Sequence, residues 1–83
     1  MYYVYILQSK KDNELYIGST NNLKKRIKEH NDGNSFATKG RRPFNLIHYQ
    51  AFLSEDDAID TEKYFKTTRG WQRIKRMLKN TIS

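Results

Sequence analysis

The spacing of apolar and polar residues predicts a short hairpin followed by a third strand. Tyr2–Gln8 (YYVYILQ) carries β-branched and aromatic side chains on both alternating faces, which is typical of a strand covered on both sides. Leu15–Ser19 predicts a second strand, and the polar turn between the two favours an antiparallel hairpin. A third strand is expected over Phe44–Phe52, where Pro43 fixes the exit from a loop at 34–42.

Helical periodicity fills the remaining segments. Three helices are predicted: from a cap at Thr20 or Asn21 to about Asn31, from a cap at Ser54 to about Thr68, and from Trp71 to Asn80. Gly70 is expected to separate the last two. The order β-β-α-β-α-α predicts an α/β (α+β) fold, a three-stranded, mainly antiparallel sheet flanked by helices. With 83 residues, the chain is expected to form a single domain over 1–83.

The charge balance points to a polyanionic partner. The chain has 16 Lys and Arg against 9 Asp and Glu, a net charge of +7. For a small domain this favours nucleic acid over an anionic membrane, although ordinary soluble domains can carry such a charge. The basic residues are clustered at Lys24–Lys28, at Lys39–Arg42 and between Lys63 and Lys79. Separated clusters suit a phosphate-binding surface better than a charged tail.

Other features of the composition exclude several classes. The sequence has no cysteine, which excludes a disulfide scaffold, a zinc–thiolate site and a cysteine nucleophile. Aromatic residues make up 13% of the chain, too many for a disordered tail. The longest uncharged apolar run, Tyr2–Leu7, is far shorter than a membrane span, and no targeting segment is expected. No membrane partner is expected, and the expected location is cytoplasmic.

One carboxylate interrupts an apolar helix face. On the helix after Ser54, Glu62 projects between Ala58 and Ile59, near the centre of the apolar stripe. A carboxylate in this position is costly unless it is paired or binds a metal. Two interpretations are equally open from this feature alone. In the structural one, Glu62 pairs with an arginine or the helix face has a different phase, and in the functional one Glu62 is a metal ligand.

A histidine continues the apolar face of the first helix. Leu23 and Ile27 mark the buried side, His30 follows them, and Arg26 lies one turn before His30. A lone histidine in such a position is more often a core or capping residue than a catalyst. The neighbouring guanidinium favours a functional role, because its planar fork binds phosphate in a bidentate manner.

Tyrosines form a third feature, on the hairpin. Tyr3 and Tyr5 share one face of the first strand, and Tyr16 can approach Tyr5 from the second. Gly18 leaves backbone room on the same face. Taken alone, cross-strand aromatic packing is the commoner explanation of such a cluster.

Together these motifs resemble the GIY-YIG nuclease superfamily. The second signature triplet is intact as Tyr16-Ile17-Gly18, whereas the first reads Tyr3-Val4-Tyr5 in place of Gly-Ile-Tyr. By position, the family's helix arginine matches Arg26, its histidine matches His30 and its metal-binding glutamate matches Glu62. The resemblance covers nearly the whole chain and is strongest to the small stand-alone, single-domain branch. This superfamily also includes the N-terminal domain of the bacterial excision-repair nuclease and the GIY-YIG homing endonucleases.

The resemblance implies a metal-dependent endonuclease that hydrolyses phosphodiester bonds. The expected substrate is DNA rather than RNA, recognised by structure with low sequence specificity, as in DNA repair. The expected cofactor is one Mg²⁺ or Mn²⁺ ion on Glu62, and Arg26 would neutralise charge on the scissile phosphate. Tyr5 or Tyr16 would act as general base, and His30 would take on its proton or hold it in place. The expected contacts to the nucleic-acid backbone are basic: Lys24, Lys39, Arg41 and Arg42.

Two other functions remain open on the sequence. The first is a nucleic-acid-binding module without catalysis, which would use the same basic and aromatic surface. The second is a structural or partner-binding domain. The oligomeric state, monomer or weak dimer, also remains open.

Overall fold

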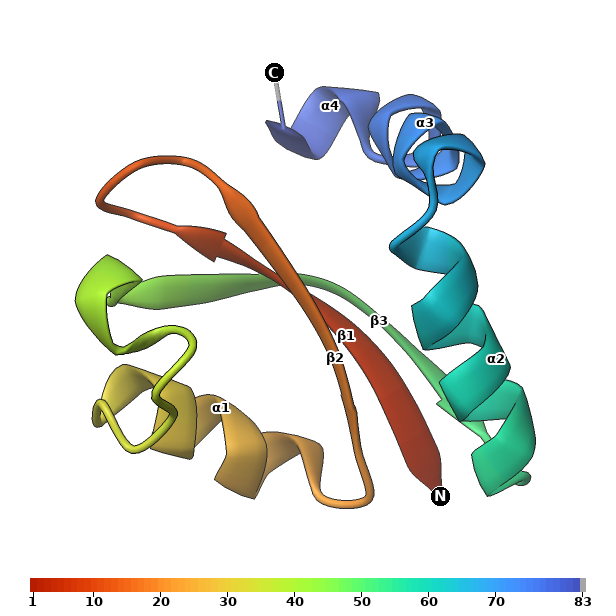
Figure 1. Cartoon of the computed structure of the whole chain (residues 1–83), viewed down its shortest axis with the longest axis horizontal. Helices are drawn as coiled ribbons and strands as arrows, with labels where there is room; N and C mark the ends of the chain where they lie inside the picture. The colour runs from red at the N-terminus through yellow and green to blue at the C-terminus, as the bar shows by residue number, and fades with distance from the viewer. Residues whose placement is uncertain (83) are drawn as a thin grey trace.

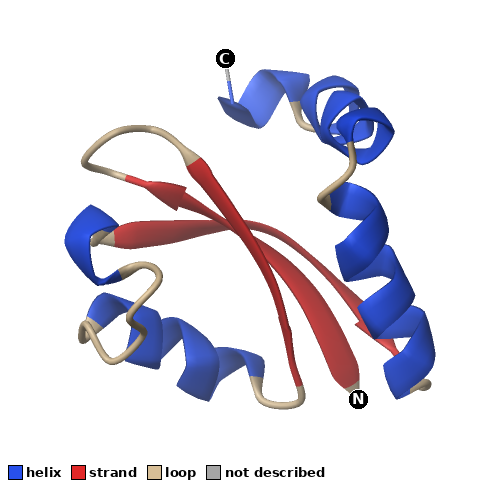
Figure 2. Cartoon of the chain, viewed as in Figure 1, coloured by secondary structure: helices blue, strands red, loops and turns tan. Residues whose placement is uncertain are grey.

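The computed structural model describes residues 1–82 and contains one antiparallel sheet of three strands in the order β2-β1-β3 (Figure 1). Its strands are β1 (Tyr2–Ser9), β2 (Leu15–Thr20) and β3 (Phe44–Phe52). The order of elements confirms the predicted α/β fold, with β1 at the centre and β2 at one edge. Figure 2 shows how strongly the strands twist and that the helices lie on both sides of them.

The central strand is buried on both faces, as its composition predicts. On one face, Val4 and Ile6 belong to a core with Ile17, Ala58 and Ile74. On the other face, Tyr5 and Leu7 pack with Phe44, and the first helix contributes Leu23 and Ile27. Successive strand residues point to opposite faces, so adjacent tyrosine and valine side chains in β1 enter different cores. A thin sheet therefore carries two separate apolar clusters.

Helices cover the two faces unequally. They are α1 (Leu23–Asn31), α2 (Glu55–Phe65), α3 (Thr68–Met77) and α4 (Lys79–Ile82), and a single 3₁₀ turn, η1, spans Lys39–Arg41. In Figure 1, α1 lies on one side of β2, and α2 lies on the other, followed by α3. The sheet thus presents the edge strand β2 between two helical layers.

The first helix is capped one residue later than expected. Asn22 caps it, through its side-chain oxygen, which accepts a hydrogen bond from the Lys25 amide at 3.2 Å. The predicted caps, Thr20 and Asn21, lie outside the helix, and Thr20 instead accepts a hydrogen bond from the Asn22 amide. Asparagine is a strong cap because its short side chain reaches the free amides of the first turn.

The predicted boundary at Gly70 between the last two helices is wrong. Helix α2 ends at Phe65. Thr67 then caps α3, because its side-chain oxygen accepts a hydrogen bond from the Gly70 amide at 3.1 Å. Gly70 lies inside the first turn of α3, where a Cβ atom would come within 1.8 Å of the Tyr64 carbonyl oxygen. The glycine is required by the close passage of α3 over the end of α2, not by a break in the helix.

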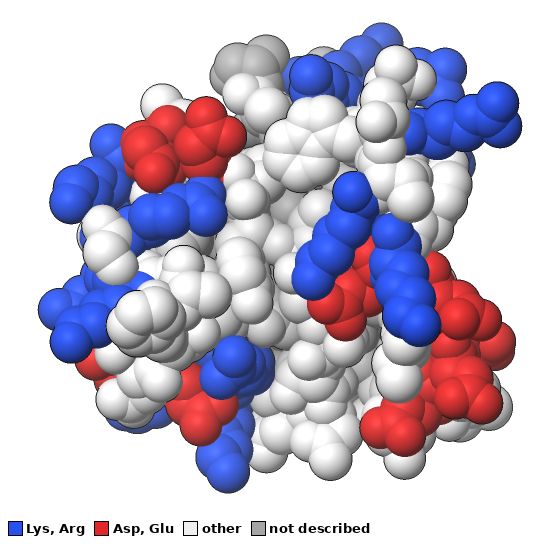
Figure 3. Space-filling view, in the orientation of Figure 1, with Lys and Arg blue, Asp and Glu red and all other residues white. Residues whose placement is uncertain are grey.

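Charge is distributed unevenly over the surface. Figure 3 shows acidic side chains gathered over α2 and basic side chains over the region of α3. The acidic group belongs to the first turn of α2 (Glu55, Asp56 and Asp57), where carboxylates interact favourably with the helix dipole. Within residues 1–82, no helix has the length and apolar character needed to cross a membrane.

Candidate active site at the edge strand

Tyr5 occupies the middle of the sheet and reaches toward the edge strand. Its direct partner across the β1–β2 ladder is Gly18. A Cβ atom at Gly18 would lie only 2.4 Å from the Tyr5 hydroxyl oxygen, so the tyrosine side chain fills the space that a larger residue would need. The missing side chain at Gly18 therefore lets the Tyr5 hydroxyl reach β2.

The Tyr5 hydroxyl begins a buried chain of hydrogen bonds. It lies 2.8 Å from His30 Nε2, and His30 Nδ1 lies 2.7 Å from Thr38 Oγ1. Tyr5 is 1% exposed, and both His30 and Thr38 are 0% exposed. His30 is therefore buried, as its place on the apolar helix face predicts, and it is hydrogen-bonded to the Tyr5 hydroxyl.

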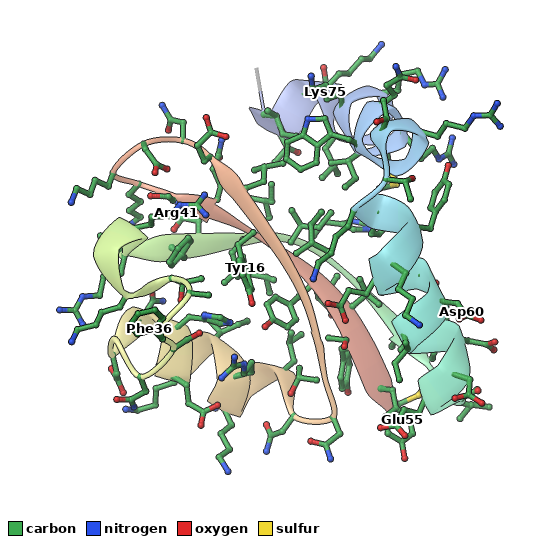
Figure 4. The ribbon with its side chains drawn as sticks, in the orientation of Figure 1. Tyr16, Phe36, Arg41, Glu55, Asp60 and Lys75 are labelled. Carbon is green, nitrogen blue, oxygen red and sulfur yellow. The ribbon has the colours of Figure 1, made fainter. Side chains whose placement is uncertain are left out.

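Tyr16 completes the aromatic cluster but remains partly open to solvent. Its ring centroid lies 5.0 Å from that of His30 and 6.5 Å from that of Tyr5. Both tyrosines lie on the α1 face, since Tyr16 pairs with Leu7, two residues from Tyr5 along β1. Figure 4 shows Tyr16 near the centre of the view, on the side of the sheet where α1 lies.

Arg26 borders this cluster from α1. Its guanidinium forms an ion pair with Glu29 at 3.5 Å, and its side chain is 33% exposed. It also interacts with the Tyr5 hydroxyl, where its positive charge favours the phenolate form. The arginine is therefore partly accessible and close to the Tyr5 hydroxyl.

Burial decides the protonation of this cluster. It raises the pKa of Tyr5 to about 12, although the hydrogen bond from Arg26 acts in the opposite direction. It also lowers the pKa of His30, and the positive charge of Arg26 adds to that effect. At neutral pH the protein therefore holds Tyr5 protonated and His30 uncharged.

Glu62 approaches β2 from the opposite face of the sheet. Its Oε1 accepts a hydrogen bond from the Ser19 hydroxyl at 2.5 Å, and its Oε2 accepts one from Lys66 Nζ at 2.7 Å. It lies in line with the buried residues Ala58 and Phe65, which confirms the predicted phase of the helix face. The carboxylate is less buried than that phase suggests, at 21% side-chain exposure, and its ion-pair partner is a lysine instead of an arginine.

The carboxylate of Glu62 is held in its ionised form. Burial disfavours the charge, but the hydrogen bonds from Lys66 and Ser19 outweigh that effect and lower the pKa of Glu62. The ion pair joins Glu62 to Lys66, the C-cap residue of α2, and the lysine side chain is 50% exposed, so the pair can open at small cost when another cation arrives. Glu62 is thus available as an anionic oxygen ligand.

Two consecutive residues of β2 bring the separated groups together. Gly18 contacts the Tyr5 hydroxyl on one face, and Ser19 holds the Glu62 carboxylate on the other. The negative charge of Glu62 also contributes to the raised pKa of Tyr5, so the two groups interact around the strand. In Figure 1 the view falls on β2, with α1 to one side and α2 to the other. Tyr5, Tyr16, Arg26 and His30 therefore share the α1 face of the sheet, and Glu62 faces them around the edge strand.

The donor set fits a hard divalent ion with few protein ligands. Within residues 1–82, no group of three or more His, Asp or Glu side chains lies close enough together to hold a metal. Glu62 is ionised and presents oxygen atoms, the ligand type that Mg²⁺ and Mn²⁺ prefer. Mg²⁺ keeps several waters and takes oxygen atoms from a phosphate substrate, so one carboxylate is compatible with a bound ion.

The basic residues expected to contact nucleic acid differ in their surroundings. Lys24, Lys39 and Arg42 are exposed on the α1 and loop side. Arg41, in contrast, is engaged within the fold: its Nε donates to Asp12 at 3.3 Å, its Nη2 donates to the Leu15 carbonyl at 3.4 Å, and its guanidinium lies 6.0 Å from the Phe44 ring centre. Its immediate role is to connect the hairpin turn to the loop before β3.

Three residues of the site were not singled out by the sequence. Ser19 and Lys66 hold Glu62, and Thr38 holds His30. Lys66 could have been found, because it follows Glu62 by four residues. Ser19 and Thr38 carry no comparable signal. Ser19 lies 43 residues from Glu62 in the sequence, and Thr38 lies 8 residues from His30, outside the helix.

Comparison with known proteins identifies the family. Residues 1–75 match the GIY-YIG catalytic domain. The chain belongs to the GIY-YIG nuclease family. A UPF0213 protein of Clostridium perfringens is 41% identical over 83 residues, which cover 99% of this chain and 88% of the relative. A UPF0213 protein of Pediococcus pentosaceus is also 41% identical over 83 residues, covering 99% and 86%.

A solved structure supports the same assignment. The solution NMR structure of a UPF0213 protein from Bacillus halodurans is 36% identical and superposes with a TM-score of 0.57, covering 93% of this chain and 85% of that one. The names of these GIY-YIG relatives state no activity. Membership of the family and the fold are established by these matches.

Proposed function

We propose that this GIY-YIG protein is an endonuclease that hydrolyses phosphodiester bonds in DNA and requires a divalent metal ion. One observation carries the proposal: an ionised carboxylate and a tyrosine hydroxyl flank consecutive residues of one edge strand, Ser19 and Gly18. A partly exposed arginine adjoins the same tyrosine. Carboxylate, arginine and hydroxyl groups at one strand edge are suited to phosphoryl chemistry, where charge must be neutralised and protons moved.

Arg26 is the residue best placed to bind the scissile phosphate. It comes from α1, its side chain is 33% exposed, and its ion-pair partner within residues 1–82 is Glu29, which is 36% exposed. A phosphate oxygen can replace that carboxylate, because an exposed ion pair contributes little stability. Its guanidinium would stabilise the charge that builds on the non-bridging oxygens in the transition state.

The two tyrosines take different roles. Tyr16 is partly exposed and packs against His30, so solvent can reach it and it is the better candidate to orient or deprotonate the attacking water. Tyr5 is buried, and its high pKa opposes loss of the proton, so it acts as a hydrogen-bonding group. Tyr16→Phe is therefore expected to reduce cleavage more than Tyr5→Phe.

Glu62 would hold the metal, one Mg²⁺ or Mn²⁺ ion. When bound there, such an ion supplies positive charge next to the scissile phosphate. Ser19 fixes one carboxylate oxygen of Glu62 from the sheet, which orients the other toward solvent and Lys66. Supporting hydrogen bonds of this kind hold a metal ligand in position.

The proposed substrate is DNA recognised by its structure, as in DNA repair, with little sequence preference. The exposed cations Lys24, Lys39 and Arg42 would contact backbone phosphates, which carry no sequence information. The net charge of +7 favours such contacts.

A cleavage panel tests this proposal. Single-stranded, duplex, nicked and branched DNA of one sequence are incubated with the protein and Mg²⁺, Mn²⁺ or EDTA, alongside the matching RNA strands. We expect metal-dependent cuts in at least one DNA substrate and faster cleavage of an irregular structure than of the plain duplex. Binding without cleavage in every arm would instead identify a non-catalytic nucleic-acid-binding module.

A further inference from the structure

The buried chain Tyr5–His30–Thr38 contains three polar hydrogens but only two hydrogen bonds between its members. An uncharged imidazole offers one N–H donor and one nitrogen acceptor. Both of its partners here are hydroxyl groups, Tyr5 at 2.8 Å and Thr38 at 2.7 Å. Only one hydroxyl can donate to the ring, so the hydrogen of the other must find a different acceptor.

The surroundings of the two hydroxyls are unequal. Thr38 is 0% exposed and lies behind His30, and within residues 1–82 its hydroxyl is hydrogen-bonded to His30 alone. A buried hydroxyl hydrogen without an acceptor is costly. The Tyr5 hydroxyl, in contrast, lies at Gly18 on the edge strand, next to Arg26, which is partly exposed. Tyr5 is also buried, but of the two ends of the chain only its hydroxyl adjoins a partly exposed side chain, so an incoming oxygen atom would have to arrive from that side.

We infer that Thr38 is a positioning residue that donates its hydroxyl hydrogen to His30 Nδ1 and so holds His30 in the Nε2–H tautomer. His30 then donates to the Tyr5 oxygen, and the Tyr5 hydroxyl hydrogen points toward the site. If the proposed nuclease function is right, that hydrogen is donated to a phosphate oxygen of the substrate. Tyr5 would then be a donor to the substrate, and His30 would not be its base.

Burial has the largest effect on the protonation of this chain, and four neighbouring groups modify it. Arg26 and Glu29 act on His30 with opposite signs, and Tyr16 and Glu62 both act on Tyr5. None of them hydrogen-bonds to Thr38 within the residues described. The tautomer of His30 is therefore controlled from the Thr38 side.

Nitrogen NMR of the protein tests the tautomer without any assay of activity. In ¹⁵N-labelled protein at pH 7.5, the two ring nitrogens of His30 give distinct shifts, and long-range ¹H–¹⁵N correlations identify the protonated one. We expect protonated Nε2 and unprotonated Nδ1 in the wild type. Protonated Nδ1 would overturn the inference, whether or not the protein cuts DNA.

Two substitutions separate positioning from folding. Thr38→Ser keeps the hydroxyl and is expected to keep the Nε2–H tautomer. Thr38→Val keeps the shape and removes the donor, so His30 is expected to shift toward the Nδ1–H tautomer. In a cleavage assay, Thr38→Val should lower kcat about tenfold or more with little change in KM, and Thr38→Ser should restore it. A folded Thr38→Val protein with the wild-type tautomer would contradict the inference.

A second feature, independent of this chain, is an open groove on the same face of the sheet. It has a volume of about 500 Å³ and lies between α1 and the β1–β3 pair. Its walls combine aromatic, apolar and polar side chains: Tyr3, Leu46, Tyr49, Lys24, Asn21 and Asn22. The Tyr49 side of the groove is open, since that residue is 52% exposed.

The chemistry of this groove matches a nucleobase. Tyr3 and Tyr49 form an edge-to-face pair with centroids 6.2 Å apart, which leaves an aromatic surface for stacking. The side-chain amide of Asn21 and the amide nitrogen of Asn22, whose oxygen caps α1, can hydrogen-bond base edges, and Lys24 supplies positive charge for the adjoining phosphate. The groove also adjoins the site, because Ile27 lines it and packs against the Tyr5 cluster.

We propose that this groove binds an unpaired nucleotide next to the cleavage site, so that the preferred substrate contains a single-stranded segment. A base within a duplex is stacked and paired, and cannot enter such a groove. This inference rests on the proposed nuclease function for its purpose, but the binding it predicts does not require cleavage.

Binding measured without metal separates the proposed groove from the proposed nuclease function, because cleavage is not required. Fluorescence anisotropy in EDTA compares a single-stranded oligonucleotide with its blunt duplex, using the wild type, Tyr49→Ala and, as a control, Tyr64→Ala, which removes another exposed tyrosine. We expect Tyr49→Ala to weaken single-strand binding about tenfold and to leave duplex binding unchanged. Tyr64→Ala is expected to change neither affinity. Wild-type single-strand affinity in folded Tyr49→Ala protein, or a wild-type dimer that Tyr49→Ala dissociates, would overturn the proposal.

Discussion

At the residue scale, the surroundings of His30, Glu62 and Arg41 are decided by the contacts that each side chain makes. His30 was placed correctly on the buried face of α1, because helical spacing is regular over two turns. The burial of Glu62 was overestimated, because its exposure depends on its position beside the edge strand and on Lys66. Arg41 was expected at the surface, but contacts with Asp12 and the Leu15 carbonyl hold it in the fold. Such contacts join distant segments, so no local pattern reveals them.

Two substitutions test whether Arg26 binds phosphate through its charge alone or through the planar shape of its guanidinium. Arg26→Ala is expected to lower the rate of DNA cleavage at least about a hundredfold, the scale on which a preorganised donor stabilises a transition state. Arg26→Lys should recover only part of this loss, because an ammonium lacks the bidentate fork. Single-turnover cleavage rates measure both. Full activity in the lysine variant would contradict specific phosphate binding by Arg26.

Burial of Tyr5 predicts a pH dependence of stability. Its pKa rises from 10.0 to about 12 on folding, so below pH 10 both states hold the proton and this contribution is fully present. As the pH rises from 10 to 12 the unfolded state loses the proton first, and up to about 2–3 kcal/mol of stability is lost. Urea unfolding at pH 9 and pH 11.5 should show a smaller loss for Tyr5→Phe than for the wild type. Equal losses in the two proteins would contradict the buried, protonated hydroxyl.

At the scale of elements, strands were easier to predict than helix ends. The aromatic and β-branched run of β1 admits one interpretation, and its two-sided burial follows directly. The boundary between α2 and α3 was misplaced because Gly70 was taken as a helix breaker. Its actual reason, the passage of α3 over the Tyr64 carbonyl, exists only in three dimensions. The sequence also predicted Tyr5 and Glu62 in one site without indicating that they approach β2 from opposite faces.

The edge strand β2 is where both halves of the site meet, and Gly18 tests this arrangement. Gly18→Ala would place a Cβ atom 2.4 Å from the Tyr5 hydroxyl oxygen, so the tyrosine must move away from His30. We expect a loss of about 1–3 kcal/mol in unfolding free energy and near-complete loss of cleavage in the fraction that folds. Chemical denaturation and cleavage rates measure the two effects. An alanine variant with wild-type stability would show that Tyr5 does not pack against β2 as described.

At the scale of the whole molecule, net charge controls the encounter with nucleic acid. The excess of 16 basic over 9 acidic residues is spread over separate clusters, so binding should be weak, tolerant of sequence and sensitive to salt. Titrations between 50 and 300 mM salt are expected to give a slope of log K against log salt of about −3 to −6, corresponding to a few neutralised phosphates. Tight binding that is insensitive to salt, or a sharp sequence preference, would contradict backbone-directed recognition.

Nicking of a supercoiled plasmid by Glu62→Ala protein is the decisive measurement. Asp60→Ala is the matched control, because Asp60 is an exposed carboxylate on the same helix that points away from the sheet (Figure 4). Circular dichroism and DNA binding first establish that both variants fold and bind like the wild type. The expected result is nicking by wild type and Asp60→Ala with Mg²⁺ or Mn²⁺, none with EDTA, and none by Glu62→Ala under any condition. Nicking by folded Glu62→Ala protein at the wild-type rate would contradict a metal-dependent site built on Glu62.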